Sequence, residues 1–132
     1  MRNLLVKVKK RVSKKFKYIV LNGMASSIIT PRVIRYYLYK MMGLKVKTNN
    51  ISPRCFFSGT NVEIGEGTFI NYNCYFENLS GIKIGKNVAV AHEVMFCTAT
   101  HEIGNSDKRA TTPIGNPITV EDGCWIGTRA TI

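Results

Sequence analysis

The stretch IGKNVAVAHEVMFCTATH, residues 84–101, repeats with a period of six. A large apolar residue recurs at every sixth position and a small residue follows each one, at Ile84 and Gly85, Val90 and Ala91, and Phe96 and Cys97. An amphipathic helix needs apolar residues every three or four positions and a half-buried strand needs strict alternation, so neither structure fits this spacing. A six-residue period is typical of a stacked parallel β-helix, in which a short strand and a corner are repeated.

Similar units occur on both sides of this stretch. They are IGEGTF at residues 64–69, INYNCY at 70–75 and ITVEDGCWIG at 118–127, and turn-forming residues separate the apolar runs at Asn49, Asn50, Pro53, Gly59, Gly65 and Gly67. Such residues are expected at the corners of a coil. With about eighteen residues per turn, we predict an irregular turn over 46–63, a second over 64–83, a third from Ile84 and an incomplete fourth from Ile118. The polar segment 102–117 breaks the period, and we expect it to loop out of the coil.

Charge is divided unevenly along the 132 residues. Residues 1–62 contain fourteen Lys or Arg and no Asp or Glu, whereas residues 63–132 contain five basic and eight acidic residues. Within residues 1–20 a basic amphipathic helix is predicted, because apolar residues recur among lysines at helical spacing, at Leu5, Val8, Val12, Phe16 and Ile19. Two roles stay open for it: an anchor to anionic lipid headgroups, or a solvated charged face. Nucleic acid ranks lower as a partner, because no nucleic-acid-binding motif accompanies the charge.

A second helix is predicted over residues 31–42. Thr30 has the form of an N-cap, Pro31 suits the first helical position, and Gly43 suits the stop. One apolar stripe runs along the segment, at Val33, Ile34, Tyr37, Leu38 and Met41. We expect the helix to pack on the first turn of the coil or to cover its open end, where a terminal strand exposes unpaired backbone groups.

The four cysteines predict neither a disulfide framework nor a zinc site. Cys55, Cys74 and Cys124 occupy the fifth position of hexapeptide-like units, where small inward-facing residues are usual, and the chain has no CxxC motif. We therefore expect free, buried thiols in a reducing cytoplasm. The apolar segment 18–30 is interrupted by polar residues and is too short to span a bilayer, so we expect the protein not to be secreted.

Together with CTATH at residues 97–101, these units resemble the left-handed β-helix hexapeptide acyltransferases, above all the galactoside, maltose and polysaccharide-biosynthesis O-acetyltransferases. The resemblance implies an all-β solenoid, a left-handed parallel β-helix over residues 50–132, after a basic N-terminal α-helical segment over residues 1–49. The left hand is implied by the resemblance alone, because crossovers between parallel strands are otherwise nearly always right-handed. A homotrimer with active sites between neighbouring subunits is implied as well.

The resemblance also assigns roles to single residues. His101, the histidine of CTATH, matches the general base of the family, and Asn71 matches an asparagine that positions the acceptor. Trp125 matches a tryptophan that reaches the shared active site, and Gly127 and Thr128 follow where the pantetheine arm of coenzyme A would run. From the residues alone, structural readings stay open: a lone histidine, a corner asparagine and an outward-facing tryptophan are all common in such coils. Asn73 fits the corner role better than Asn71 does.

Two positions depart from the family pattern. Leu79 stands where relatives have an acceptor-binding aspartate, so Glu77 is the candidate substitute from a shifted register. Glu102 follows the histidine where the family usually has proline. His92 reads as an exposed corner residue, and with two histidines in total the chain lacks the three zinc ligands of a γ-class carbonic anhydrase.

The function implied is transfer of an acetyl group from acetyl-CoA to a sugar hydroxyl, with a cell-surface polysaccharide precursor as the first acceptor and free mono- or disaccharides as the second. No metal and no nucleic acid are expected, and the location is the cytoplasm, at the inner membrane surface. The alternative is a non-catalytic β-helix scaffold, or a module that binds anionic membranes through residues 1–20. Relatives continue for several further hexapeptides that carry much of the coenzyme A site, so both a piece of a longer protein and a truncated form stay open.

Overall fold

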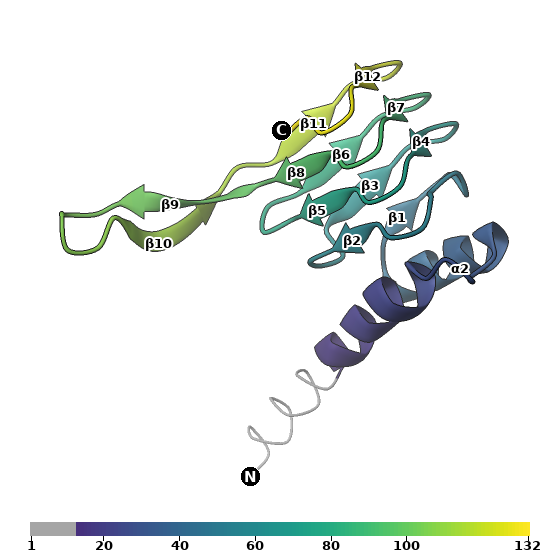
Figure 1. Cartoon of the computed structure of the whole chain (residues 1–132), viewed down its shortest axis with the longest axis horizontal. Coiled ribbons are helices and arrows are strands. Elements are labelled where there is room, and N and C mark those ends of the chain that lie inside the picture. Colours follow the sequence, from purple (N-terminus) through teal and green to yellow (C-terminus); the bar gives the residue numbers. More distant parts are fainter. Residues whose placement is uncertain (1–12) are drawn as a thin grey trace, which may run out of the picture.

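The computed structural model describes residues 13–132 (Figure 1). Residues 13–19 are α-helical and continue into the π-helix η1 (Val20–Ala25), and α2 (Arg32–Met42) follows after a turn. The strands are β1 (Lys45–Val46), β2 (Phe56–Phe57), β3 (Val62–Ile64), β4 (Phe69–Ile70), β5 (Tyr75–Glu77), β6 (Ile82–Ile84), β7 (Ala89–Val90), β8 (Met95–Cys97), β9 (Ala99–Ile103), β10 (Ala110–Gly115), β11 (Ile118–Val120) and β12 (Trp125–Ile126). Residues 1–12 of the predicted basic helix lie outside the described residues.

The strands of the coil form three parallel sheets, here called first (β1-β3-β6-β11), second (β4-β7-β12) and third (β2-β5-β8). Consecutive strands belong to different sheets, and each pairs in register with the strand one turn later. In the first sheet Val46 pairs with Ile64, Ile64 with Ile84, and Ile84 with Val120, so that partners are 18, 20 and 36 residues apart. The chain therefore winds as a three-sided coil of stacked turns, and the turns start within two residues of the predicted positions.

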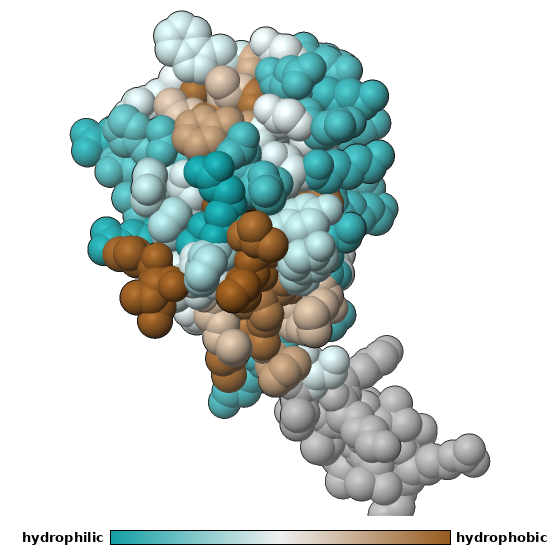
Figure 2. All heavy atoms as spheres, turned by 90° about the vertical axis from the view of Figure 1, so that its right-hand side faces the viewer, coloured by the Kyte–Doolittle hydropathy of each residue, from teal (hydrophilic) through white to brown (hydrophobic). Residues whose placement is uncertain are grey.

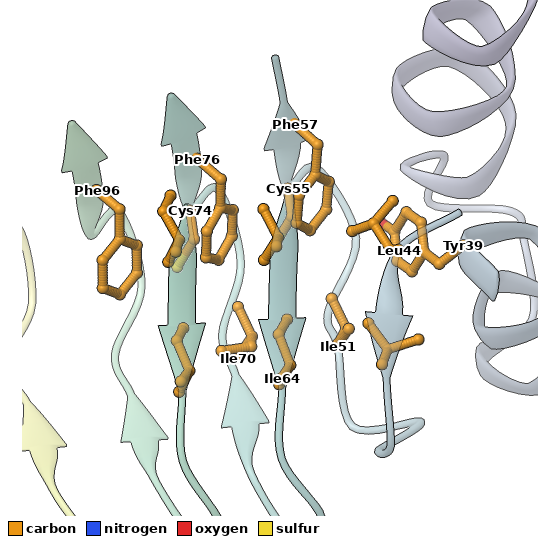
Figure 3. Close-up of a cluster of buried hydrophobic side chains, with 14 of the residues drawn as sticks. Tyr39, Leu44, Ile51, Cys55, Phe57, Ile64, Ile70, Cys74, Phe76 and Phe96 are labelled. Carbon is orange, nitrogen blue, oxygen red and sulfur yellow. The ribbon is translucent and has the colours of Figure 1, made fainter. Parts of the chain in front are cut away.

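The interior of the coil is filled by columns of apolar side chains from successive turns (Figure 3). The rings of Phe57, Phe76 and Phe96 stack in one column, with centroid separations of 4.6 and 5.0 Å. Ile84, Val90 and Phe96, the large residues of the six-residue period, are all buried. The period of six thus arises because every sixth residue enters the core from the next sheet.

The prediction of buried thiols is right for two cysteines and wrong for the third. Cys55 and Cys74 are buried, free and stacked in one column, and a hydrogen bond to Cys74, together with burial, holds the pKa of the Cys55 thiol well above its usual range. Cys124 is also free, but it is exposed. It takes the place of Val88 one turn later, as the pairing of Trp125 with Ala89 shows, and no further turn within residues 13–132 covers it.

Two corners of the coil place one residue per turn in the left-handed region of backbone conformation. Between the first and second sheets these residues are Gly67, Asn87 and Gly123, and between the second and third sheets they are Arg54, Asn73, Glu93 and Arg129. Glycine adopts this conformation without steric cost, and asparagine does so more readily than most residues. The corner role predicted for Asn73 is confirmed, with φ at 61°.

Helix α2 starts one residue later than predicted. Pro31, with extended backbone, is the N-cap, and the Thr30 hydroxyl donates to the carbonyl of Met24 instead of capping α2. The prediction of the stop is confirmed, because Gly43 closes the helix with φ at 105°. No helix within residues 13–132 is long and apolar enough to cross a bilayer.

The helix packs on the first turn of the coil, but of the predicted apolar stripe only Leu38 packs against the core. Arg35, Tyr39 and Met42 are the buried residues of α2, whereas Val33, Ile34, Tyr37 and Met41 are each more than half exposed. The Arg35 guanidinium is tolerated inside because it donates to four carbonyls, those of Ala25, Ser27, Thr30 and Ile51. A buried charge can replace an apolar contact when each of its nitrogens has a hydrogen-bond partner, and periodicity alone does not reveal this.

The segment predicted to loop out of the coil is a β-hairpin. Strands β9 and β10 pair antiparallel and project away from the coil between β8 and β11 (Figure 1). At the root, the Asn116 amide donates to the Thr98 carbonyl at 3.0 Å. The polar composition of residues 102–117 is thus explained by exposure of the hairpin, since nearly all of its side chains face solvent.

Candidate active site

His101 lies in β9, on the projecting hairpin. Its side chain is exposed, and the residue stands opposite Pro113 of β10. Within residues 13–132 the imidazole makes no hydrogen bond and no ion pair with another side chain. A neutral imidazole has one nitrogen free to accept a proton, so this group is accessible for general-base chemistry.

Glu77 is held at the root of the same hairpin. Its carboxylate accepts a hydrogen bond from the Thr98 hydroxyl at 3.0 Å and another from the Leu79 amide at 3.0 Å. The side chain is half-buried, at the end of β5 next to Cys97 of β8. Glu77 therefore orders the point where the hairpin leaves the coil. Its partner Thr98 is not among the predicted site residues. The sequence does mark it, because Thr98 is a polar residue at the end of a hexapeptide run.

Asn71 lies at the corner between the second and third sheets. Its side-chain oxygen accepts a hydrogen bond from the Tyr72 amide at 2.8 Å, and its backbone amide donates to the Val90 carbonyl. The side-chain NH₂ group makes no hydrogen bond inside the described part of the chain. This corner presents an oriented amide donor that a ligand oxygen could use.

Trp125, Gly127 and Thr128 lie on the same side of the coil as Asn71. Trp125 follows Ala89 and Phe69 on the outer surface of the second sheet, and its side chain is 80% exposed. Gly127 occupies the corner position of Asn71 two turns later, about 10 Å away if each turn adds the usual strand spacing. A Cβ at Gly127 would meet nothing within 4 Å, so the backbone there is open to a ligand.

An ion pair reinforces this corner. The Arg129 guanidinium donates to the Glu93 carboxylate at 2.5 Å, joining the last two turns. This hydrogen bond, and the charge of Arg129, hold the pKa of Glu93 below its usual range. His92 lies beside Glu93 and is exposed, as predicted for a corner residue.

The predicted residues thus form two groups rather than one. The corner that precedes β5 and β8 carries Asn71, Trp125, Gly127 and Thr128. At the opposite ends of these strands, Glu77 is the last residue of β5 and His101 lies four residues beyond the end of β8. The hairpin that carries His101 points away from that corner (Figure 1). One chain does not bring the imidazole to the Asn71 amide. No cluster of three or more metal-binding side chains occurs within residues 13–132.

Several curated proteins are similar to parts of this chain. A Schizosaccharomyces pombe protein named "Putative acetyltransferase" is 40% identical over 75 residues, which are 57% of this chain and 36% of that protein. Nodulation protein L of Rhizobium leguminosarum bv. viciae is 32% identical over 74 residues, 56% of this chain and 39% of that protein. Galactoside O-acetyltransferase of Escherichia coli K12 is 28% identical over 83 residues, 62% of this chain and 41% of that protein. The chain therefore spans less than half the length of these curated relatives.

A solved structure agrees with these sequences. The crystal structure of a maltose O-acetyltransferase from Clostridium difficile 630 matches with a TM-score of 0.60 at 28% identity, over 94% of this chain and 69% of that one. No family model matches the chain. The resemblance to hexapeptide-repeat acetyltransferases that the sequence predicted is confirmed by these relatives.

Proposed function

We propose that this chain provides the coil and catalytic hairpin of an O-acetyltransferase that moves an acetyl group from acetyl-CoA to a sugar hydroxyl. The observation that carries the proposal is the exposed imidazole of His101, which has no hydrogen-bond partner within residues 13–132, in a chain whose fold matches a maltose O-acetyltransferase. The names of the galactoside and maltose O-acetyltransferases support a sugar as the acceptor class.

The proposed reaction uses His101 as a general base. The imidazole removes the proton from the sugar hydroxyl while the oxygen attacks the thioester carbonyl of acetyl-CoA. The tetrahedral intermediate collapses by breaking its carbon–sulfur bond, and the imidazolium returns the proton to the departing thiolate. The products are the O-acetyl sugar and free coenzyme A. In this scheme Asn71 donates its amide hydrogen to the acceptor, Glu77 holds the hairpin root and approaches the acceptor, and Trp125, Gly127 and Thr128 border the thioester arm.

The site is proposed to form between subunits of a homotrimer of left-handed coils. The separation of the Asn71 corner from the His101 hairpin supports this, because the hairpin of one subunit could reach the corner of the next. Mixing two impaired variants, His101→Ala and Asn71→Ala, in refolded oligomers tests it. If His101 and Asn71 of one site come from neighbouring subunits, random mixing regenerates about a quarter of the sites. Such a site takes its His101 from an Asn71→Ala subunit and its Asn71 from a neighbouring His101→Ala subunit, and each choice has a probability of about one half. No recovery of activity would place both residues in the same subunit's site or leave the chain a monomer.

The acceptor is proposed to be a hydroxyl on a cell-surface polysaccharide precursor, at the cytoplasmic side of the membrane. Free mono- and disaccharides are the second acceptor class. Release of coenzyme A thiol from acetyl-CoA, measured with each class, tests the function. We expect acceptor-dependent release that exceeds hydrolysis without acceptor. Equal inactivity on every acceptor would favour the alternative, a non-catalytic scaffold.

A further inference from the structure

Helix α2 carries a second apolar face that nothing within residues 13–132 covers. The side of α2 turned away from the core presents Val33, Ile34, Tyr37 and Met41, each more than half exposed, and Val33 and Tyr37 also border an open groove beside the coil. Val33, Tyr37 and Met41 follow one another at intervals of four, so they form one stripe along the helix. An amphipathic helix normally turns its apolar stripe inward, and α2 turns this stripe outward.

The stripe continues onto the turn before α2. Ile28 and Ile29 are 59% and 89% exposed, and Met24 of η1 is also exposed. The hydrogen bond from Thr30 to the Met24 carbonyl, 2.6 Å, holds the end of η1 beside this turn. Figure 2 shows hydrophobic groups gathered in the lower half of the molecule, at the level of the helices in Figure 1. We call Met24, Ile28, Ile29, Val33, Ile34, Tyr37 and Met41 the outer apolar face.

Basic groups border the outer apolar face. Residues 13–62 contain nine Lys or Arg and no Asp or Glu. Lys40 lies on α2 with its Nζ 5.0 Å from the Tyr36 ring centroid, and the Arg54 amide donates to the Ser26 carbonyl at the turn. A groove of about 520 Å³ between α2 and the coil adds Lys47, and Glu66 is the one carboxylate in its lining. Arg35 is buried in the fold and Lys45 is paired with Glu63, so the charge beside the face comes mainly from Lys40 and Lys47. Basic groups therefore outnumber acidic ones beside the outer apolar face.

We propose that the outer apolar face docks on an anionic lipid bilayer surface. Its isoleucine, valine and methionine side chains would enter the boundary between headgroups and acyl chains, while the bordering lysine and arginine side chains meet the lipid phosphates. This surface differs from the segment 1–20 that the sequence suggested. The docking does not depend on the proposed acetyl transfer.

Charge and shape favour lipid over other occupants. A second copy of the chain would bring two regions of the same positive sign together, which costs free energy unless acidic groups intervene. Nucleic acid phosphates would satisfy the basic groups but offer little to seven exposed apolar side chains. An anionic bilayer matches both features at once.

The test uses the full chain and vesicles of phosphatidylglycerol mixed with phosphatidylcholine, with pure phosphatidylcholine vesicles as the neutral reference. The variant Ile29→Gln with Val33→Gln removes two apolar groups of the outer face without changing charge. The variant Leu79→Gln with Ile103→Gln is its matched control, because these coil and hairpin residues are exposed to nearly the same extents. Leu79 is 56% exposed, as Val33 is, and Ile103 is 87% exposed against 89% for Ile29. Circular dichroism checks that both variants fold.

In co-sedimentation we expect salt-sensitive binding to the anionic vesicles, about tenfold weaker for the outer-face variant and unchanged for the control. A second readout places tryptophan on the face, as Tyr37→Trp with Trp125→Phe, and brominated lipid should quench its fluorescence. The proposal is overturned if the outer-face variant binds as the wild type does, which would assign binding to the basic segment alone. The proposal is also overturned if brominated lipid does not quench the tryptophan at position 37. A third contrary result is that the wild type does not bind vesicles while the outer-face variant has a different oligomer mass, which would make the face a contact between copies of the chain.

Discussion

Replacing Phe76 by alanine should remove a large part of the stability of the coil. The ring is completely buried and lies between two others, 4.6 Å from the Phe57 centroid and 5.0 Å from the Phe96 centroid. A buried phenylalanine hides about 200 Å² of surface, which at about 25 cal/mol per Å² corresponds to about 5 kcal/mol. Measured losses for such truncations are about 3–5 kcal/mol. Because domains are stable by only about 5–15 kcal/mol, the variant should be severely destabilised.

Urea unfolding followed by far-UV circular dichroism measures this loss, at one fixed protein concentration because association would shift the midpoint. Tyr75→Ala is the matched control, since Tyr75 directly precedes Phe76 in β5, points outward, and within residues 13–132 stacks only on Phe56, at 4.6 Å. We expect the control to lose about 1 kcal/mol. If Phe76→Ala costs no more unfolding free energy than Tyr75→Ala, the inward column does not hold the coil together and the reasoning is refuted.

Three further changes test separate contacts by the same unfolding measurement. Tyr39→Phe should stabilise the protein by about 1 kcal/mol, because the buried hydroxyl has no partner within residues 13–132 and burial keeps its pKa far above the usual range; a loss of stability would reveal a partner. Gly85→Ala should destabilise by about 1–3 kcal/mol, because its Cβ would lie 2.7 Å from the Asp122 amide nitrogen; an unchanged midpoint would show that the corner can shift. Glu93→Gln should lower stability near neutral pH and lose this effect in acid. The ion pair with Arg129 depresses the folded-state pKa of Glu93, so its stabilising contribution disappears as the pH falls through that lowered pKa. A difference in stability that does not change with pH would contradict this.

The sequence predicted the coil because its determinants are local and repeated. The six-residue period is visible in the sequence at Ile84, Val90 and Phe96, and each of these side chains enters the core from a different sheet. The corner position of Asn73 and the stop at Gly43 follow from backbone preferences of single residues. Handedness and assembly have no such local signal, and both stay predictions that the resemblance implies.

The errors arose where burial depends on distant partners. Arg35 is buried because carbonyls from the turn before α2 and from Ile51 surround its guanidinium, and these meet only in the folded chain. Cys124 has the spacing of an inward residue but lies in the last turn of the described coil. The departure of residues 102–117 from the coil is confirmed, but the antiparallel pairing of β9 with β10 lies outside the six-residue period and has no signal in it. For the site, sequence order placed Asn71 thirty residues before His101 but could not show that they lie at opposite ends of β5 and β8.

The rate of acetyl transfer by His101→Ala tests the central claim most directly. With acetyl-CoA and an acceptor that the unaltered protein acetylates, we expect kcat to fall about 10²–10⁴-fold, since the hydroxyl loses its general base. Affinity for coenzyme A, measured by calorimetry, should be retained, and His92→Ala, which removes the other exposed imidazole, should keep most of the rate. A His101→Ala variant that transfers acetyl groups with the kcat of the unaltered protein would contradict the account, because the imidazole on the hairpin would then take no part in the chemistry.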